Sequence, residues 1–157
     1  MGIVVDVPAL RRWLEEYARL IEANATHLTE LDSAIGDADH GTNMRRGTTA
    51  VRTALATDPP DPAAGPAAVL KRAAMTLIST VGGASGPLYG TLFLRMATAA
   101  GPADSLDGPA FAAALRAGLD GVVGRGRATA GDKTMYDALA PACDALDASC
   151  RSRPRTT

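Results

Sequence analysis

Three aspartates stand close together in the stretch LDSAIGDADHGTNMRRG, residues 31–47. Asp32, Asp37 and Asp39 fall within eight residues, separated by glycine and other small residues. Ionised carboxylates crowded in this way repel one another, and a divalent cation turns that repulsion into binding. Mg²⁺ prefers hard oxygen ligands and keeps positions for water or phosphate, whereas this stretch lacks the ligand spacing of an EF-hand calcium loop. The pattern therefore predicts a Mg²⁺ site that leaves room for phosphate groups.

The same aspartates have a structural alternative, because aspartate commonly caps the first turn of a helix. Asp39 stands immediately before a predicted helix and is the one expected to cap it in part. Three aspartates at this spacing, together with His40 and Asn43, exceed what capping requires, so the metal site is preferred. Gly36 and Gly41 are expected to let the backbone turn sharply enough to direct the carboxylates inward.

A glycine-rich turn follows further along the chain, in VGGASGPLYG, residues 81–90. Gly82 and Gly83 remove side chains, so backbone N–H groups there can hold phosphate. The next helix adds its positive N-terminal end, and Ser85 adds a hydroxyl. The turn is neither a Walker A loop nor a dinucleotide-binding GxGxxG loop, because no strand precedes it. A tight turn between closely packed helices is the structural alternative.

A third stretch, GRGRATAGDKTM at residues 124–135, has the composition to accept a flat ligand. Gly126 allows close approach of such a ligand, for example a nucleobase. Thr134 and Met135 are expected in the first turn of the helix that follows, where the pliable methionine would contact the base. The alternative is that Met135 belongs to the core, as a methionine at helical spacing commonly does.

Helical periodicity dominates the sequence and predicts about six helices. Their apolar stripes cover residues 10–21, 44–55, 70–81, 87–100, 111–122 and 135–146. The first helix is expected to begin at Asp6 or Pro8 and the last at Asp132, with Pro141 kinking the last one. No strand alternation is found, so an all-α antiparallel up-and-down barrel or bundle is expected. In such a bundle the loops after odd-numbered helices gather at one end, which would bring the three stretches together.

The composition supports one domain, expected over residues 1–150, followed by a disordered basic tail at 151–157. Hydrophobic residues form 46% of the chain and aromatic residues only 4%, so small aliphatic side chains must fill the core. A formal net charge of −1 argues against nucleic acid and against a polybasic membrane anchor. With no secretion signal and no apolar stretch of the ~20 residues that cross a bilayer, a cytoplasmic protein is expected. Cys143 and Cys150 are interpreted as ordinary helix residues.

The motifs LDSAIGDADHGTNMRRG, GGASGPLYG and GDKTMYDALAP, in this order, resemble the nucleotide-binding L subunit of dihydroxyacetone kinase over about residues 10–148. The resemblance implies an antiparallel helical barrel with ADP or ATP bound at one end. It implies that the three aspartates bind Mg²⁺ and that Gly126, Thr134 and Met135 lie beside the nucleotide. The residues that it implies around the phosphates are His40, Gly41, Thr42, Asn43, Ala84 and Ser85.

The resemblance also implies partners. In one branch of the family, ADP stays bound as a phosphate carrier, an M subunit of the phosphotransferase system rephosphorylates it, and a K subunit holds dihydroxyacetone. In the other branch an equivalent domain is fused to the K domain and uses ATP directly. Because this chain has no K domain, the arrangement with separate subunits is preferred. No catalytic residue is assigned here, since the histidine that holds dihydroxyacetone belongs to the K subunit.

Family members usually continue beyond the point where this chain stops, so its six helices are expected to form an incomplete barrel beside the family's eight. Such a barrel would expose apolar surface and favour self-association, for example as a homodimer. Two alternatives follow: a truncated, non-catalytic nucleotide-binding or regulatory module, and a remnant that binds no ligand. A nucleotide domain like that of fatty acid kinase is a third, although the histidine of DADHG, His40, favours the dihydroxyacetone branch.

Overall fold

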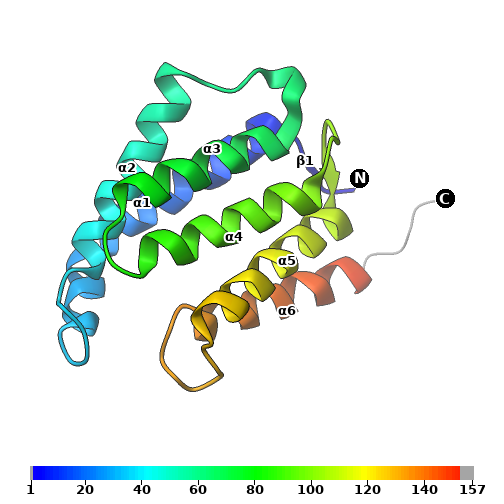
Figure 1. Ribbon diagram of the computed structural model, residues 1–157. Helices are drawn as coiled ribbons and strands as arrows, with labels where there is room; N and C mark the ends of the chain where they lie inside the picture. Colours follow the sequence, from blue (N-terminus) through cyan, green and yellow to red (C-terminus); the bar gives the residue numbers. More distant parts are fainter. Residues whose placement is uncertain (1, 153–157) are drawn as a thin grey trace.

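The structure, a computed structural model, describes residues 2–152 and is almost entirely helical (Figure 1). The six α-helices are α1 (Val7–Asp32), α2 (His40–Thr57), α3 (Gly65–Thr80), α4 (Ser85–Ala100), α5 (Gly108–Gly126) and α6 (Tyr136–Ser152). A short 3₁₀ helix, η1 (Pro62–Ala64), precedes α3, and two strands, β1 (Val4–Val5) and β2 (Leu106–Asp107), pair antiparallel. The predicted all-α class with about six helices is confirmed.

The strand pair departs from the expectation that the chain has no strands. Two residues are too few to show an alternating pattern, so the sequence gives no signal for it. Each strand leads directly into a capped helix. The Asp6 carboxylate accepts the N–H of Ala9 at 2.8 Å, and the Asp107 carboxylate accepts the N–H of Ala110 at 2.8 Å. The strand pair therefore holds the starts of α1 and α5 together, and Asp6 is the predicted helix start.

The core consists mainly of aliphatic and methionine side chains from α1 to α5, with Phe93 from α4 and Cys143 from α6. Side chains that are less than 2% exposed include Leu10, Met44, Val69, Leu70, Leu77, Met96, Val122 and Cys143. Most of them belong to the predicted stripes, which confirms the helical periodicity. Trp13 and Ile78 also belong to the stripes but remain 37% and 40% exposed, because they lie at the edge of the buried face. Both cysteines are free, as expected.

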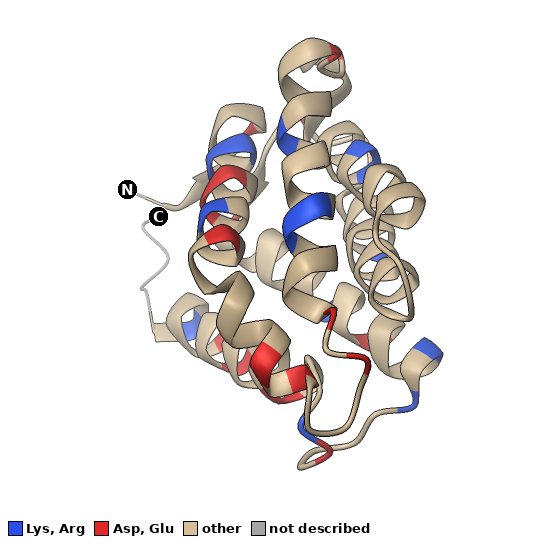
Figure 2. Ribbon diagram, turned by 90° about the vertical axis from the view of Figure 1, so that its left-hand side faces the viewer, with Lys and Arg blue, Asp and Glu red and all other residues tan. Residues whose placement is uncertain are grey.

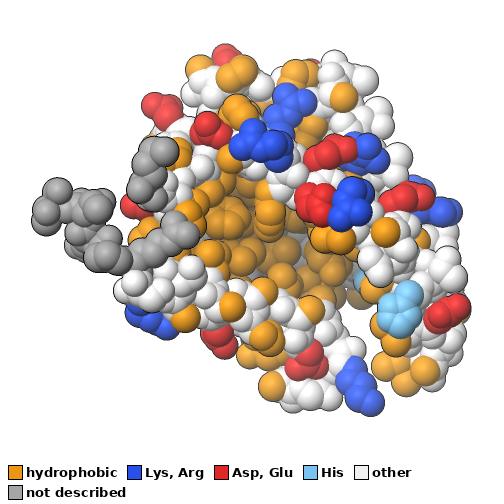
Figure 3. Space-filling model, turned by 180° about the vertical axis from the view of Figure 1, so that it is seen from behind, with side chains coloured by type: hydrophobic (Ala, Val, Ile, Leu, Met, Phe, Trp, Pro, Cys, Tyr) orange, Lys and Arg blue, Asp and Glu red, His pale blue; other side chains and the backbone are white. Residues whose placement is uncertain are grey.

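Consecutive helices run antiparallel and pack in chain order, so the helices form an incomplete ring (Figure 1). Each of α1 to α5 packs against the next helix, but within residues 2–152 the last helix does not pack extensively against the first. The ring is therefore open between α1 and α6. Seen from behind, this side of the molecule is a hollow lined by hydrophobic side chains, with charged residues around its rim (Figure 3).

The C-terminal helix begins and ends differently from the expectation. It starts at Tyr136, and Asp132 does not cap it. The Asp132 carboxylate instead accepts the N–H of Thr129 at 2.9 Å within the preceding loop. Pro141 lies inside the helix, as expected. The helix also includes residues 151 and 152, which the sequence assigned to a disordered tail, and the rest of that tail lies outside the described residues.

None of the helices in residues 2–152 combines the length and the hydrophobicity that crossing a bilayer requires.

Candidate functional site

Three loops lie together at one end of the bundle (Figure 1). They connect α1 to α2 (33–39), α3 to α4 (81–84) and α5 to α6 (127–135). A hydrogen bond of 3.0 Å between Ser85 Oγ and His40 Nδ1 joins the first two. The third approaches through Gly126, where an added Cβ would lie 3.1 Å from the Leu88 side chain in the first turn of α4. The expectation that these loops gather at one end is confirmed.

Asp32, the last residue of α1, fixes the acidic loop through its carboxylate. Its Oδ2 atom accepts the N–H of Asp39 at 3.0 Å and that of His40 at 3.3 Å. Since these are free donors at the start of α2, Asp32 caps that helix from across the loop. Asp39 forms no capping hydrogen bond with its own side chain, because its backbone is not in the extended conformation that a capping residue usually adopts. The expectation that Asp39 caps α2 is therefore wrong.

The glycines of this loop provide space rather than a left-handed turn. The positive φ in the loop belongs to Ala38, at 57°. A Cβ on Gly36 would collide with the Asp32 carboxylate, and one on Gly41 would collide with the Ala25 carbonyl in α1. Glycine at these two positions lets Asp32 reach over the loop and lets α2 start directly against α1. A non-glycine residue with positive φ costs roughly 1–3 kcal/mol and is common in binding loops.

The three predicted metal ligands share this loop but do not surround one point. Asp37 and Asp39 are exposed and Asp32 is half-buried. Among residues 2–152, no three His, Cys, Asp or Glu side chains stand close enough to hold one metal ion. The donor chemistry still fits Mg²⁺, because all three side chains offer carboxylate oxygens and the helix cap uses only Oδ2 of Asp32. Figure 2 faces this end of the molecule and shows acidic positions on its loops.

The α3–α4 loop lies beside the start of α2. Gly83 has a φ of 65° and open space where a Cβ would point, a conformation that suits glycine. The Ser85–His40 hydrogen bond places the N-terminal ends of α4 and α2 next to each other, and both ends carry partial positive charge. The residues at these two helix starts are those expected around phosphate, namely His40, Gly41, Thr42, Asn43, Ala84 and Ser85. Their binding role stays a prediction.

Sequence reasoning missed Arg46, whose side chain bridges α2 and α3. Its Nη2 donates to Asn43 Oδ1 at 2.7 Å, and its Nε donates to the Thr80 carbonyl at 3.0 Å. The spacing of three residues between Asn43 and Arg46 on one helix is a signal that the sequence did offer. The contact with Thr80 joins residues 34 positions apart and has no such signal.

The α5–α6 loop is organised by carboxylates that accept backbone N–H groups. Asp137, in the first turn of α6, accepts from Gly131 at 2.9 Å and from Lys133 at 2.8 Å. The hydrogen bond from Gly131, supported by that from Lys133, holds the pKa of the Asp137 carboxyl below its usual range despite some desolvation. Arg127 and Lys133 both have positive φ, at 53° and 58°. These bonds hold the loop in a compact shape that the sequence did not predict.

Thr134 and Met135 lie just before α6, not in its first turn as expected. The later start of α6 follows from the Asp137 hydrogen bonds, which keep the preceding backbone in a loop. Thr134 Oγ1 accepts the N–H of Tyr136 at 3.3 Å, which is a local turn contact. Met135 is half-buried and packs against the core. A contact between Met135 and a nucleobase stays a prediction.

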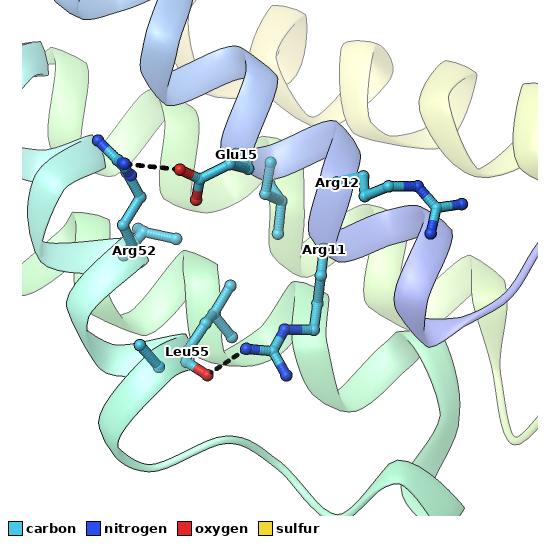
Figure 4. Close-up of a pocket in the computed structure, with 8 residues that line it drawn as sticks. Arg11, Arg12, Glu15, Arg52 and Leu55 are labelled. Carbon is cyan, nitrogen blue, oxygen red and sulfur yellow. Dashed lines mark hydrogen bonds and ion pairs between the residues drawn. The ribbon is translucent and has the colours of Figure 1, made fainter.

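A cavity of about 250 Å³ lies elsewhere, between α1 and the C-terminal half of α2 (Figure 4). Two of the three arginines that line it are engaged within the protein: Arg11 Nη2 donates to the Leu55 carbonyl at 2.7 Å, and Arg52 pairs with Glu15 at 2.6 Å. Arg11 thereby satisfies a free carbonyl near the end of α2. None of the residues predicted to bind a ligand lines this cavity, so we assign its polar groups to packing between the two helices.

The fold and the three joined loops define an all-α helical domain with a candidate phosphate-binding end. The chain belongs to the DAK2 domain family, whose family model matches residues 34–156.

Similar proteins fit this assignment. The chain is 43% identical over 135 residues to the PEP-dependent dihydroxyacetone kinase 1, ADP-binding subunit DhaL, of Listeria innocua, covering 86% of this chain and 66% of that protein. It is 43% identical over 134 residues to the corresponding subunit of Escherichia coli, covering 85% and 62%. It is 39% identical over 122 residues to human triokinase/FMN cyclase, covering 78% and 20%. The chain therefore spans slightly less than two thirds of the bacterial subunits it matches.

A solved structure shares the fold. The crystal structure of the dihydroxyacetone kinase from C. freundii in complex with AMP-PNP and Mg²⁺ superimposes with a TM-score of 0.78. The two sequences are 25% identical, and the match covers 96% of this chain and 27% of that one.

Proposed function

We propose that this chain is an ADP- or ATP-binding subunit of dihydroxyacetone kinase that works with Mg²⁺. The observation that carries the proposal is the Ser85–His40 hydrogen bond, because it joins the acidic loop and the glycine-rich loop at one end of the bundle. The printed names of the relatives, which are ADP-binding subunits, support the proposal. They favour it over a regulatory module or a ligand-free remnant.

In the proposed site, the chain's own residues hold and orient a nucleotide. Asp32, Asp37 and Asp39 supply the oxygen ligands for Mg²⁺, which when bound neutralises phosphate charge during phosphoryl transfer. The N–H groups at the starts of α2 and α4 and the Ser85 hydroxyl hold the phosphates. Gly126 and Met135 flank the base. These residues position the nucleotide, and positioning with charge stabilisation accounts for most of the catalysis in this chemistry.

The proposed partners are a K subunit that carries dihydroxyacetone and an M subunit that supplies phosphate. The relatives named PEP-dependent support this route over direct use of ATP. We propose the cytoplasm as the site of this activity. This part of the proposal is tested by measuring phosphate transfer to dihydroxyacetone in a mixture of the chain with the K and M subunits.

The experiment that tests the site is calorimetric titration with ADP, with and without Mg²⁺. Asp37→Ala is the informative variant, because Asp32 also caps α2 and its replacement would disturb the loop. We expect Asp37→Ala to weaken Mg²⁺-dependent ADP binding about tenfold or more, since it removes a charged ligand. Asp104→Ala, an exposed aspartate before β2, is the matched control and should bind as the unmodified chain does. Equal affinity of the two variants would exclude Asp37 from the metal site.

A further inference from the structure

Arg46 occupies a position between the two loops that are expected to bind phosphate. It lies in the second turn of α2, three residues after Asn43. Its Nη2 donates to Asn43 Oδ1 at 2.7 Å, and its Nε donates to the carbonyl of Thr80, the last residue of α3, at 3.0 Å. One guanidinium therefore ties the start of α2 to the end of α3, directly before the Gly82–Gly83 turn.

The contact with Thr80 stabilises the end of α3. The last carbonyls of a helix lack intrahelical partners, and the C-terminal end carries partial negative charge. Arg46 supplies both a donor and a positive charge there. The chain enters the Gly82–Gly83 turn from this point, so the bond fixes where the turn begins relative to α2.

The contact with Asn43 fixes the orientation of its amide. Asn43 is 9% exposed, so its side chain has little freedom to find other partners. Because the amide oxygen accepts from Arg46, the amide NH₂ group must use a different direction. A Cβ placed on Gly82 would lie 3.6 Å from Asn43 Nδ2 and 3.7 Å from Arg46 Nη2. Both donor groups therefore border the Gly82 backbone, where phosphate is expected.

The charge of Arg46 is not matched by a carboxylate. Among residues 2–152, no Asp or Glu oxygen lies within 4.0 Å of its guanidinium, whereas the adjacent Arg45 pairs with Glu22 at 3.9 Å. A guanidinium carries five N–H donors, and the two bonds described use two of them. A cation with no carboxylate partner and with free N–H donors beside a glycine turn can attract and bind an anion such as phosphate.

We propose that Arg46 is a positioning residue for the phosphates: it holds the Asn43 amide and the Gly82–Gly83 turn in one fixed arrangement around a nucleoside diphosphate. This inference rests on the proposed nucleotide-binding function and extends it to Arg46, a residue of the first motif that lies on α2, outside the three connecting loops. A lysine cannot replace Arg46 in this role, because an ammonium is a point charge on a flexible stem and cannot bridge both acceptors as a planar fork does.

The test compares Arg46→Lys and Arg46→Gln with the matched control Arg45→Gln, which changes the neighbouring exposed arginine on the same helix. ADP binding in Mg²⁺ is measured by calorimetry and adenosine binding by ligand-observed NMR. We expect both Arg46 variants to weaken ADP binding about tenfold or more, as for loss of hydrogen bonds to a charged group. Adenosine binding should change less than about twofold, because it has no phosphate. Arg45→Gln should leave both affinities unchanged.

Two results would overturn the proposal. Full ADP affinity in Arg46→Lys would mean that the positive charge alone suffices. Equal losses for ADP and adenosine would mean that Arg46 only supports the fold.

ADP titration of the unmodified chain tests the proposed function separately, because absence of Mg²⁺-dependent ADP binding there would refute that function. The positioning role of Arg46 can then still be tested without a ligand. In that test, the NMR signals of the Asn43 amide group and the Gly82 N–H should shift in Arg46→Gln and stay in place in Arg45→Gln. Unchanged signals in Arg46→Gln would refute the positioning role.

Discussion

Single carboxylates determine the shape of two loops at the candidate site. Asp32 holds the acidic loop by accepting two N–H groups at the start of α2, and Asp137 holds the α5–α6 loop in the same way. In both cases a charged acceptor replaces the regular backbone partner that a loop lacks. Loop shape at this end of the molecule therefore depends on these two carboxylate side chains as well as on glycine content.

Asp137 gives a prediction about pH. Its pKa is lowered from 3.8, mainly by the hydrogen bond from Gly131. A carboxyl whose pKa is lower in the folded state stabilises that state fully above the unfolded pKa and loses this contribution as the pH falls through the folded pKa. We therefore expect the amide signals of Gly131 and Lys133, followed by ¹H–¹⁵N NMR, to titrate with a midpoint below 3.8.

The control for this titration is Asp137→Asn, in which both signals should lose the transition because the titrating group is gone. Asp120→Asn, an exposed aspartate on α5, should leave it unchanged. A midpoint at or above the ordinary value in the unmodified chain would mean that the two amides do not bond to the Asp137 carboxylate.

At the scale of elements, glycines inside helices allow close crossing in one place and serve no packing role in another. Gly118 and Gly124 lie on the same helix, α5. A Cβ on Gly118 would lie 2.7 Å from the Leu92 side chain and 2.8 Å from the Leu92 carbonyl on α4. A Cβ on Gly124 would meet nothing within 4 Å. The close contact of α4 with α5 therefore depends on Gly118.

This difference predicts opposite effects of the same substitution. Gly118→Ala should lower the free energy of unfolding by about 1–3 kcal/mol, because the backbone carbonyl of Leu92 cannot move without separating the helices. Gly124→Ala should raise it by about 0.5–1 kcal/mol, because alanine favours a helix without creating a clash. Urea denaturation followed by circular dichroism measures both. A stabilising Gly118→Ala would show that α4 and α5 do not cross at this residue.

At the scale of the whole molecule, an aromatic cluster compensates in part for the open ring. Trp13 on α1 meets Phe93 on α4 with ring centroids 6.1 Å apart, and Phe111 on α5 at 5.5 Å. Both contacts are edge-to-face, which is a favourable geometry for aromatic pairs. Trp13 thus connects the first helix to the middle of the chain on the side where α6 does not reach α1.

Trp13→Ala should accordingly lower the free energy of unfolding by about 2–3 kcal/mol, less than for a fully buried tryptophan because Trp13 is 37% exposed. Trp13→Phe should recover part of the loss. Leu20→Ala, at a 47% exposed position on the same helix, is the control and should cost less than about 1 kcal/mol. The measurement is again urea denaturation by circular dichroism, since the variant removes the single tryptophan. Similar values for Trp13→Ala and Leu20→Ala would rule out the bridging role.

Much of the fold is readable from the sequence. The stripes that contain Leu10, Met44 and Leu70 predicted buried helix faces, and all three side chains are fully buried. The order of the helices also predicted that the three loops share one end, because antiparallel neighbours must alternate their ends. Local patterns sufficed for these features, since the period of a helix and the alternation of a bundle repeat along the chain.

Other features were settled only by the tertiary structure. Asp32 rather than Asp39 caps α2, α6 starts at Tyr136, and Arg46 connects α2 to α3. Each of these outcomes depends on which donor meets which acceptor after the helices have packed. The Ser85–His40 bond joins residues 45 positions apart, and the Arg46–Thr80 bond joins residues 34 apart. The sequence by itself determined the helices and the motif residues, whereas folding decided their partners, because such partners are selected by distance in space and leave no periodic signal in the chain.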